Sequence, residues 1–129
     1  MMFWKKVKID KADSTFSLYL RLKYRHCVFC GKPGKGEEGI TGLEVSHFFS
    51  RGKEGTRFFE PNCDVLCKNC HSRLGHGEDR DLYKAFKIDQ LGQDGFNRLL
   101  LKSNTYKKKD RRLDLIVAKE LLNSLTGGV

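Results

Sequence analysis

Two Cys-x-x-Cys pairs, Cys27/Cys30 and Cys67/Cys70, limit what this 129-residue chain can fold into. Each pair closes a tight turn, and together they supply the four thiolates that a tetrahedral zinc ion accepts. The alternative is two unrelated pairs of reduced thiols. A site with four sulfur ligands has no open coordination position, so the sequence predicts one structural Zn²⁺ per chain. The fifth cysteine, Cys63, lies outside both pairs, and we expect it to pack as a small buried residue.

The composition favours the same interpretation. Only 39% of the residues are hydrophobic and 32% are charged, so the chain has little material for a core and benefits from a metal. The N-terminal sequence lacks a secretory apolar segment, and no apolar run approaches the roughly 20 residues of a membrane span. We therefore expect a cytoplasmic protein without a membrane segment, in a reducing compartment where paired cysteines bind metal.

Positive charge is concentrated towards the two ends of the chain. The formal net charge is +9, of which residues 1–30 carry +5, residues 31–76 carry +1 and residues 77–129 carry +3. This distribution suits a polyanion that lies across several elements. It is equally typical of a solvated surface, so the charge alone does not decide between the two.

The N-terminal half is expected to contain one helix and one strand around the cysteines. A basic arm over residues 1–12 precedes residues 13–24, where Asp13 and Ser14 suggest a helix start, although the alternation of apolar residues also permits a strand. Beyond the first cysteine pair we expect a strand at 43–49, a loop at 50–61, and within 62–75 a helix that starts near the second cysteine pair.

The C-terminal part, residues 79–129, is predicted to be a helical extension. Helices are expected at 78–92, 94–104 and 108–128. In the last of them, apolar residues recur at helical spacing; they are Leu113, Ile116, Val117, Leu121 and Leu125. This stripe fits packing against the metal-binding core or, alternatively, a homodimer interface.

The segment between the cysteine pairs is longer than a compact zinc ribbon needs. It spans residues 31–66, against roughly 15–20 residues in such a ribbon. It contains His47 near the end of the expected strand, and then Asn62, while His71 directly follows the second pair. Three polar groups attached to one zinc scaffold indicate a functional site.

These residues form a pattern that resembles a known family. The pattern consists of C-x-x-C, a strand with His, and N-x-x-x-L-C-x-x-C-H, which occur here as CVFC, EVSHFF, NCDVLC and KNCH. It resembles the pattern of HNH endonucleases of the zinc-bound ββα-metal type. Longer stretches most resemble the phage NinG/Rap recombination endonucleases and related prophage proteins. These stretches are FSLYLRLKYRHCVFCG, SHFFSRG, TRFFEPN and CKNCHSRLG. The resemblance covers residues 10–78. It implies an α+β fold with a small zinc-stapled core over 13–78.

The same resemblance implies a function. The chain would be a metal-dependent endonuclease that hydrolyses phosphodiester bonds of DNA, including branched or recombination-intermediate DNA, in a bacterial or phage-infected cytoplasm. His47 would be the general base, and Asn62 would orient it or pin the adjoining loop. His71 would bind the catalytic Mg²⁺ or Mn²⁺. Many HNH nucleases carry an Asp before the first histidine where this chain has Ser46, and we expect Glu44, on the same strand face, to supply the carboxylate.

Basic residues outside the motif are candidates for contacts with DNA phosphates or for a merely solubilising role. They are Arg51 and Arg57 in the loop after the strand, and Lys107, Lys108, Lys109, Arg111 and Arg112 near the last helix. His26 and His76 are expected to be bystanders. Two other functions remain open: a non-catalytic zinc DNA-binding module, which Ser46 favours, and a zinc-organised protein–protein adaptor, which would use the apolar C-terminal stripe.

Overall fold

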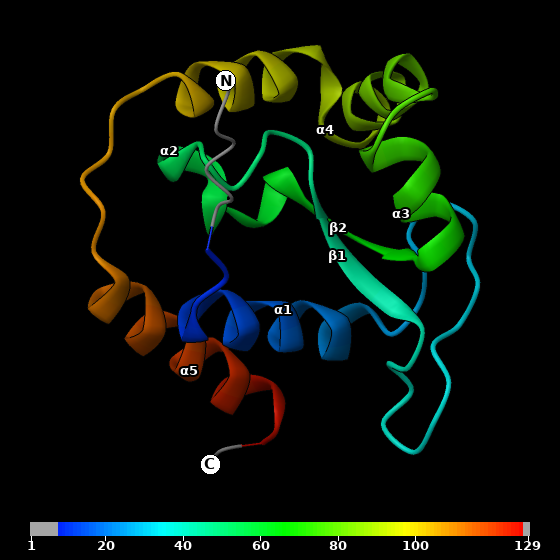
Figure 1. Cartoon of the computed structure of the whole chain (residues 1–129), viewed down its shortest axis with the longest axis vertical. Coiled ribbons are helices and arrows are strands. Elements are labelled where there is room, and N and C mark those ends of the chain that lie inside the picture. The colour runs from blue at the N-terminus through cyan, green and yellow to red at the C-terminus, as the bar shows by residue number, and fades with distance from the viewer. Residues whose placement is uncertain (1–7, 128–129) are drawn as a thin grey trace, which may run out of the picture.

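A computed structural model describes residues 8–127, in which a two-stranded antiparallel sheet is surrounded by helices. The strands lie between α1 and α4, with α3 beside one end of the hairpin (Figure 1). The elements in chain order are α1 (Lys11–Tyr24), β1 (Leu43–His47), α2 (Glu54–Arg57), the 3-10 turn η1 (Glu60–Asn62), β2 (Cys63–Cys67), α3 (Lys68–Gly75), α4 (Arg80–Ser103) and α5 (Arg111–Leu125).

The first helix begins two residues earlier than expected. Asp10 is its N-cap: its side chain accepts a hydrogen bond from the backbone N–H of Asp13, and the Asp13 carboxylate accepts one from the N–H of Asp10. This reciprocal pair satisfies two N–H groups that a helix start leaves open. Of the expected basic arm, residues 1–7 lie outside the described residues, and Lys11 and Ala12 already belong to α1.

The hairpin contains a second strand, β2, whose position the residue pattern did not indicate. β1 pairs with β2 from Leu43 opposite Cys67 to His47 opposite Cys63. All five residues of β2 are buried, so the strand lacks the alternation of polar and apolar residues by which a half-buried strand is recognised. The helix expected near the second cysteine pair starts at Lys68, as predicted. The loop expected at 50–61 contains α2 and most of η1.

The two cysteine pairs meet at the end of this hairpin. The Sγ atoms of Cys27, Cys30, Cys67 and Cys70 all lie within 4.8 Å of one another, and those of Cys30 and Cys67 are 3.8 Å apart. A tetrahedron with Zn–S bonds of about 2.3 Å has edges of about 3.8 Å. The four cysteines are thus positioned to bind a metal such as zinc, as the sequence predicted.

Cys63 lies outside this cluster. It is buried, and its Sγ is 3.5 Å from the carbonyl oxygen of Phe59. Burial, with a smaller contribution from the charge of Asp64, raises the pKa of this thiol. It therefore remains protonated at neutral pH and packs as a small apolar side chain.

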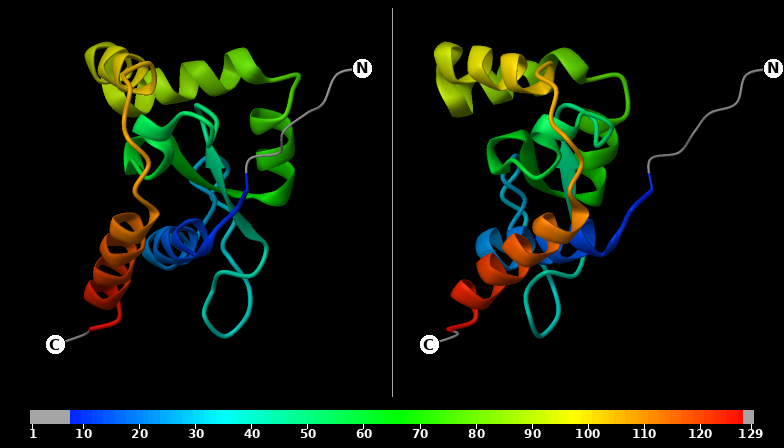
Figure 2. Two further views of the ribbon diagram at one scale, coloured as in Figure 1. Left: turned by 60° about the vertical axis from the view of Figure 1, so that its left-hand side comes forward. Right: turned by 90° about the vertical axis from the view of Figure 1, so that its left-hand side faces the viewer.

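The C-terminal region is helical, as expected, and its last helix packs on the core through one part of the predicted stripe. α4 includes both expected helices and is kinked at Gly92, whose φ of 77° lies in the left-handed region. Residues 104–110 then lead from α4 to α5, which packs against α1 and contributes to the same hydrophobic core as the metal-site cysteines (Figure 2). Ala118 and Leu121 face the core, whereas the other four residues of the predicted stripe are 41–54% exposed. A homodimer through α5 stays a prediction.

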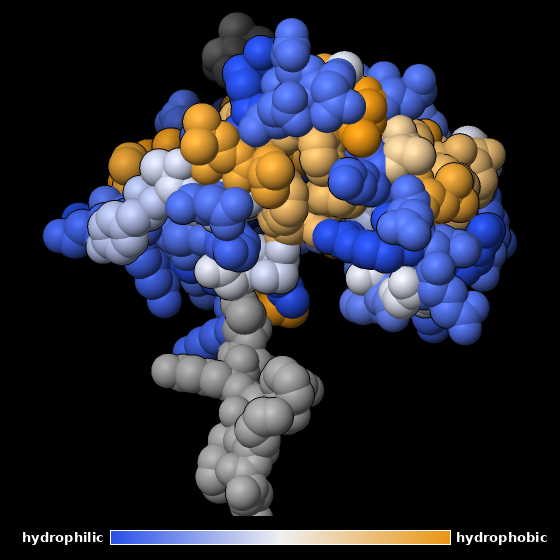
Figure 3. Space-filling view, turned by 90° about the horizontal axis from the view of Figure 1, so that it is seen from above, coloured by the Kyte–Doolittle hydropathy of each residue, from blue (hydrophilic) through white to orange (hydrophobic). Residues whose placement is uncertain are grey.

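Further apolar side chains lie on the outer surface of α4. The view over this helix shows hydrophobic residues gathered between hydrophilic ones (Figure 3); the large exposed ones on α4 are Leu82, Leu100 and Leu101. No helix within residues 8–127 combines the length and the apolar character that crossing a bilayer requires.

We predict that Cys67→Ser loses zinc and cooperative unfolding together. Structural zinc binding contributes about 10–16 kcal/mol in small domains, which is as large as the whole stability of a typical domain, about 5–15 kcal/mol. Elemental analysis and thermal unfolding measure the two effects. The matched control is Cys63→Ala, for which we expect full zinc content and a loss of about 1 kcal/mol from the smaller side chain. A folded Cys67→Ser protein without zinc, or zinc loss in Cys63→Ala, would contradict the assignment of the ligands.

Candidate functional site

A cleft of about 690 Å³ runs along β1 between α1 and α3. β1 pairs with β2 on one side only, so its other edge is open towards this cleft. The cleft brings together four of the predicted site residues and their neighbours, and its lining comprises Ile9, Asp13, Ser14, Ser17, Arg21, Leu43, Glu44, Val45, Ser46, His47, Ser50, Arg51, His71, Gly75 and His76.

His47 is the last residue of β1, and its tautomer is set by a backbone carbonyl. Its Nε2 lies 3.0 Å from the carbonyl oxygen of Arg57. A carbonyl only accepts hydrogen bonds, so Nε2 carries the proton and Nδ1 is the acceptor in the neutral ring. Burial lowers the pKa of His47 to about 4; the positive charge of Arg51 adds to this, and the bond to Arg57 opposes it. At neutral pH the imidazole is therefore uncharged and able to take up a proton.

The side chain of Arg57 lies inside the protein. Its guanidinium donates to both carboxylate oxygens of Asp13, at 2.9 and 2.5 Å, and to the backbone carbonyl of Lys8 at 2.7 Å. Burial alone would raise the pKa of Asp13, but the hydrogen bonds from Arg57 and from the backbone of Asp10 outweigh it and lower that pKa. With 5% of its surface exposed, Arg57 is not placed to contact a phosphate as the sequence suggested. Instead, the ion pair fixes the segment whose carbonyl holds His47.

Asn62 is fully buried and holds the loop that follows β1. Its side-chain oxygen accepts from the N–H of Phe49 at 2.9 Å, and its amide donates to the carbonyls of Phe49 and Thr56 at 3.0 and 3.2 Å. Its own backbone carbonyl accepts from Phe48. These contacts correspond to the second of the two roles expected for Asn62, pinning the loop. They act on His47 through the backbone of residues 48–57 and not by direct contact.

His71 projects from α3 and pairs with the predicted carboxylate. Its Nδ1 lies 2.8 Å from Oε1 of Glu44, which accepts the hydrogen bond and leaves Nε2 as the acceptor in the neutral ring. A Cβ atom at Gly75 would lie 2.9 Å from Cδ2 and 3.4 Å from Nε2 of His71. The glycine therefore keeps the space beside this imidazole open. His76, expected to be a bystander, lines the same cleft with its ring centroid 5.0 Å from that of His71.

Ser46 belongs to a buried polar network beneath the cleft. The Tyr83 hydroxyl lies 3.1 Å from Ser46 Oγ and donates to Asp64 at 2.7 Å, and Lys87 Nζ lies 3.2 Å from the same carboxylate. Burial lowers the pKa of Lys87, whereas the negative charge of Asp64 opposes this shift. The buried ammonium of Lys87 thus has a partner of opposite charge inside the protein. The network attaches the hairpin to α4. No local sequence pattern marks Tyr83 or Lys87 as its members.

The remaining basic candidates are distributed over three settings. Arg51 lines the cleft. Arg111 forms ion pairs with Glu54, Asp114 and Asp10, which raise its pKa and occupy its guanidinium. The other four basic candidates are exposed and do not line the cleft; they are Lys107, Lys108, Lys109 and Arg112. The structure thus does not gather the predicted phosphate contacts into one surface.

Comparison with known families gives a match in the central part of the chain. Residues 27–77 match the family model described as HNH endonuclease, a span that is less than half of the chain. It contains both cysteine pairs, the hairpin and α3. Neither the curated proteins nor the solved structures give a significant match to the chain. Residues 27–77 are thus similar to an HNH endonuclease domain. Together with the four-cysteine cluster and the observed helices and strands, this match confirms the predicted α+β fold with a helical C-terminal region.

Proposed function

We propose that this protein is a metal-dependent endonuclease that hydrolyses phosphodiester bonds of DNA, with His47 as general base. The observation that carries the proposal is the neutral imidazole of His47, whose protonated Nε2 is held by Arg57 and whose Nδ1 has no hydrogen-bond partner among the described residues. It lines one cleft with His71 and Glu44, inside a segment that matches an HNH endonuclease model.

The chemistry needs a proton acceptor near an anionic diester. Nδ1 of His47 accepts the proton of the attacking water, a contribution of about 10²–10⁴-fold for a positioned general base. Arg51, on the wall of the same cleft, donates to a phosphate oxygen. A bound Mg²⁺ or Mn²⁺ would supply positive charge to offset the charge that develops on the phosphate.

The residues around His71 fit such an ion. Nε2 of His71 is available because Nδ1 is engaged with Glu44, and Gly75 leaves room beside it. A carboxylate on the second ring nitrogen is the usual way in which proteins orient a metal-binding histidine. We assign His71 as a ligand through Nε2, with Glu44 orienting the ring through its hydrogen bond to Nδ1. In this arrangement Ser46, which is fully buried against Tyr83, takes no part in binding the ion.

The preferred substrate follows from the sequence motifs alone. Because these are most similar to phage NinG/Rap recombination endonucleases, we propose that the protein acts on branched DNA in a bacterial or phage-infected cytoplasm. A non-catalytic zinc DNA-binding module is the alternative, and the absence of a carboxylate at Ser46 is the observation in its favour.

Variants of the two histidines are expected to differ in metal dependence. His47→Ala should reduce plasmid cleavage by about 10²–10⁴-fold at every Mg²⁺ or Mn²⁺ concentration, because the proton acceptor is lost. His71→Ala should instead require about 10–100-fold more metal, with partial recovery at high concentration, and Glu44→Gln should behave similarly. The measurement is initial cleavage rate as a function of metal concentration.

The matched control is His26→Ala, since His26 is exposed and outside the cleft. It should cleave as the unsubstituted protein does. Cleavage unaffected by His47→Ala would refute the assignment of the base, and a protein that binds DNA without cleaving it at any metal concentration would establish the alternative function. An unaffected Glu44→Gln would remove Glu44 alone from the ion site.

The pH dependence gives a second test. Because burial lowers the pKa of His47 to about 4 from about 6.5 in the unfolded chain, the fold favours the neutral ring. The stability contributed by this group is complete above pH 6.5 and is lost as the pH falls towards 4. NMR titration of the imidazole resonances should show His47 uncharged at pH 5.5, with Nε2 protonated. A midpoint near 6.5 for His47 would contradict the buried, carbonyl-bound ring.

Substrate preference is tested with a four-way DNA junction and a linear duplex that share the same arm sequences. We expect cleavage of the junction to be faster by about tenfold or more, equivalent to about 1.4 kcal/mol of differential binding to the transition state. Equal rates on the two substrates would remove the preference for branched DNA and leave the nuclease assignment intact.

A further inference from the structure

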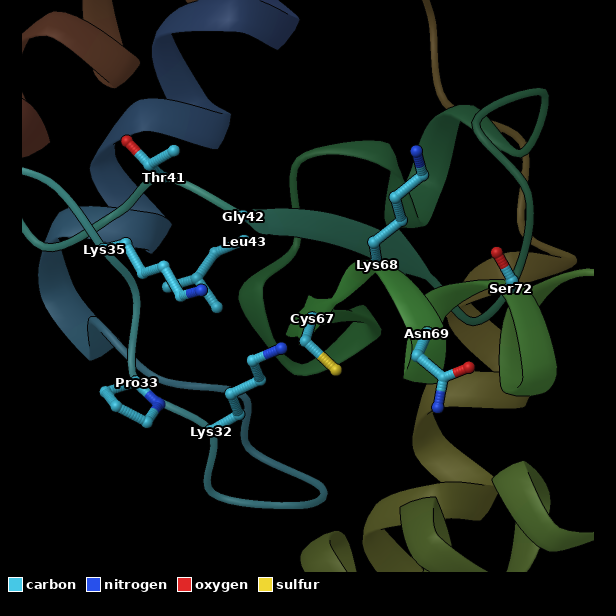
Figure 4. Close-up of a pocket in the computed structure, with 10 residues that line it drawn as sticks. All are labelled: Lys32, Pro33, Lys35, Thr41, Gly42, Leu43, Cys67, Lys68, Asn69 and Ser72. Atoms are coloured by element: carbon cyan, nitrogen blue, oxygen red, sulfur yellow. The ribbon is translucent and has the colours of Figure 1, made fainter.

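A second hollow, of about 510 Å³, lies next to the cleft on the other side of α3. We propose that this basic hollow binds the phosphate backbone of the DNA strand that flanks the cleaved bond, an inference that rests on the proposed function. It is lined by Lys32, Pro33, Lys35, Thr41, Gly42, Leu43, Cys67, Lys68, Asn69 and Ser72 (Figure 4).

Apart from the metal ligand Cys67, the charged side chains that line the hollow are lysines. Lys32, Lys35 and Lys68 are all exposed, none of them forms a salt bridge with a described residue, and the ten lining residues include no carboxylate. Other basic side chains of the domain, such as Arg57 and Arg111, are already held by acidic partners. The three lysines are therefore charges left available for an external anion.

Their arrangement suits an extended anion better than a single ion. Lys32 and Lys35 reach from the loop wall towards the middle of the hollow, whereas Lys68, on the α3 wall, extends along the rim and away from them (Figure 4). Thr41, Asn69 and Ser72 add hydroxyl and amide groups to the same walls. Contacts of this kind position a nucleic-acid backbone without reading its sequence.

The hollow and the cleft are neighbours. Leu43, the first residue of β1, lines both. Lys68 lines the hollow and His71 the cleft, and three residues of helix correspond to about 4.5 Å along its axis. A strand of duplex DNA carries one phosphate per roughly 3.4 Å of helix axis. A strand whose cleaved phosphate lies beside His71 would thus bring a phosphate only a few nucleotides away to the lysines.

A different role for these lysines would be only to offset the negative charge of the metal site. A zinc ion with four thiolates carries a net charge of about −2, and Cys67 is part of the lining. This role requires no DNA and predicts an effect on zinc retention instead, so the two roles are separated by measuring both.

The test compares two variants of the full chain that each lose three positive charges. The first variant removes the positive charge of the basic hollow by combining Lys32→Gln, Lys35→Gln and Lys68→Gln. The control variant combines Lys84→Gln, Arg98→Gln and Lys119→Gln, because these residues are exposed and line neither the hollow nor the cleft. Duplex binding is measured with Ca²⁺ in place of Mg²⁺ over a series of salt concentrations, with zinc content, KM and kcat measured in parallel.

We expect the hollow variant to bind DNA at least about tenfold more weakly at 0.1 M salt, with the slope of log K against log salt reduced by about 2–3. KM should rise with kcat within a few-fold, and zinc content should be complete. The control should change the slope by less than about 1.

Four results would overturn the inference. An unchanged salt slope and KM in the hollow variant, in a protein that still cleaves DNA, would overturn it and leave the proposed function standing. So would an equal loss in the control variant, or zinc loss with unaltered DNA binding at saturating zinc. An unsubstituted protein that neither binds nor cleaves DNA would overturn the proposed function and this inference with it.

Discussion

The site depends on the bonds between one metal ion and four thiolates. Cys67 ends β2 and Cys70 lies in the first turn of α3, so the metal site sets the direction in which the helix leaves the strand. The first cysteine pair is attached to the same hairpin by a hydrogen bond from the N–H of Val28 to the carbonyl of Val65. Because His71 directly follows Cys70, the metal ligands also determine where its imidazole enters the cleft.

The opposite wall of the cleft is supported from outside the segment that matches the HNH model. Asp13 of α1 forms the buried ion pair with Arg57, and the Arg57 carbonyl holds the ring of His47. Breaking a buried pair of this kind leaves a charge without a partner, at a cost of about 3–5 kcal/mol. On the other face, Tyr83 and Lys87 of α4 satisfy the polar groups beneath β1. The helices on either side thus support the backbone that orients His47.

Several features could be predicted because they depend on neighbouring residues. The metal ligands, the histidine at the end of a strand and the helix after the second cysteine pair all follow from short motifs. β2 could not be recognised, since a strand buried on both faces has no alternating pattern. Nor could the roles of the arginines: Arg57 finds its acidic partner 44 residues away and Arg111 finds one 57 residues away, so both are structural rather than free for phosphate.

The sequence by itself determined the four metal ligands and the order of the residues around them, because a Cys-x-x-Cys turn and the histidine beside it are defined within a few bonds of one another. Only the tertiary structure decided which ring nitrogen of His47 is free, that Glu44 pairs with His71, and which lysines have no acidic partner among the described residues. Each of these depends on groups from segments far apart in the chain. Their separation is set by packing, which no local pattern encodes.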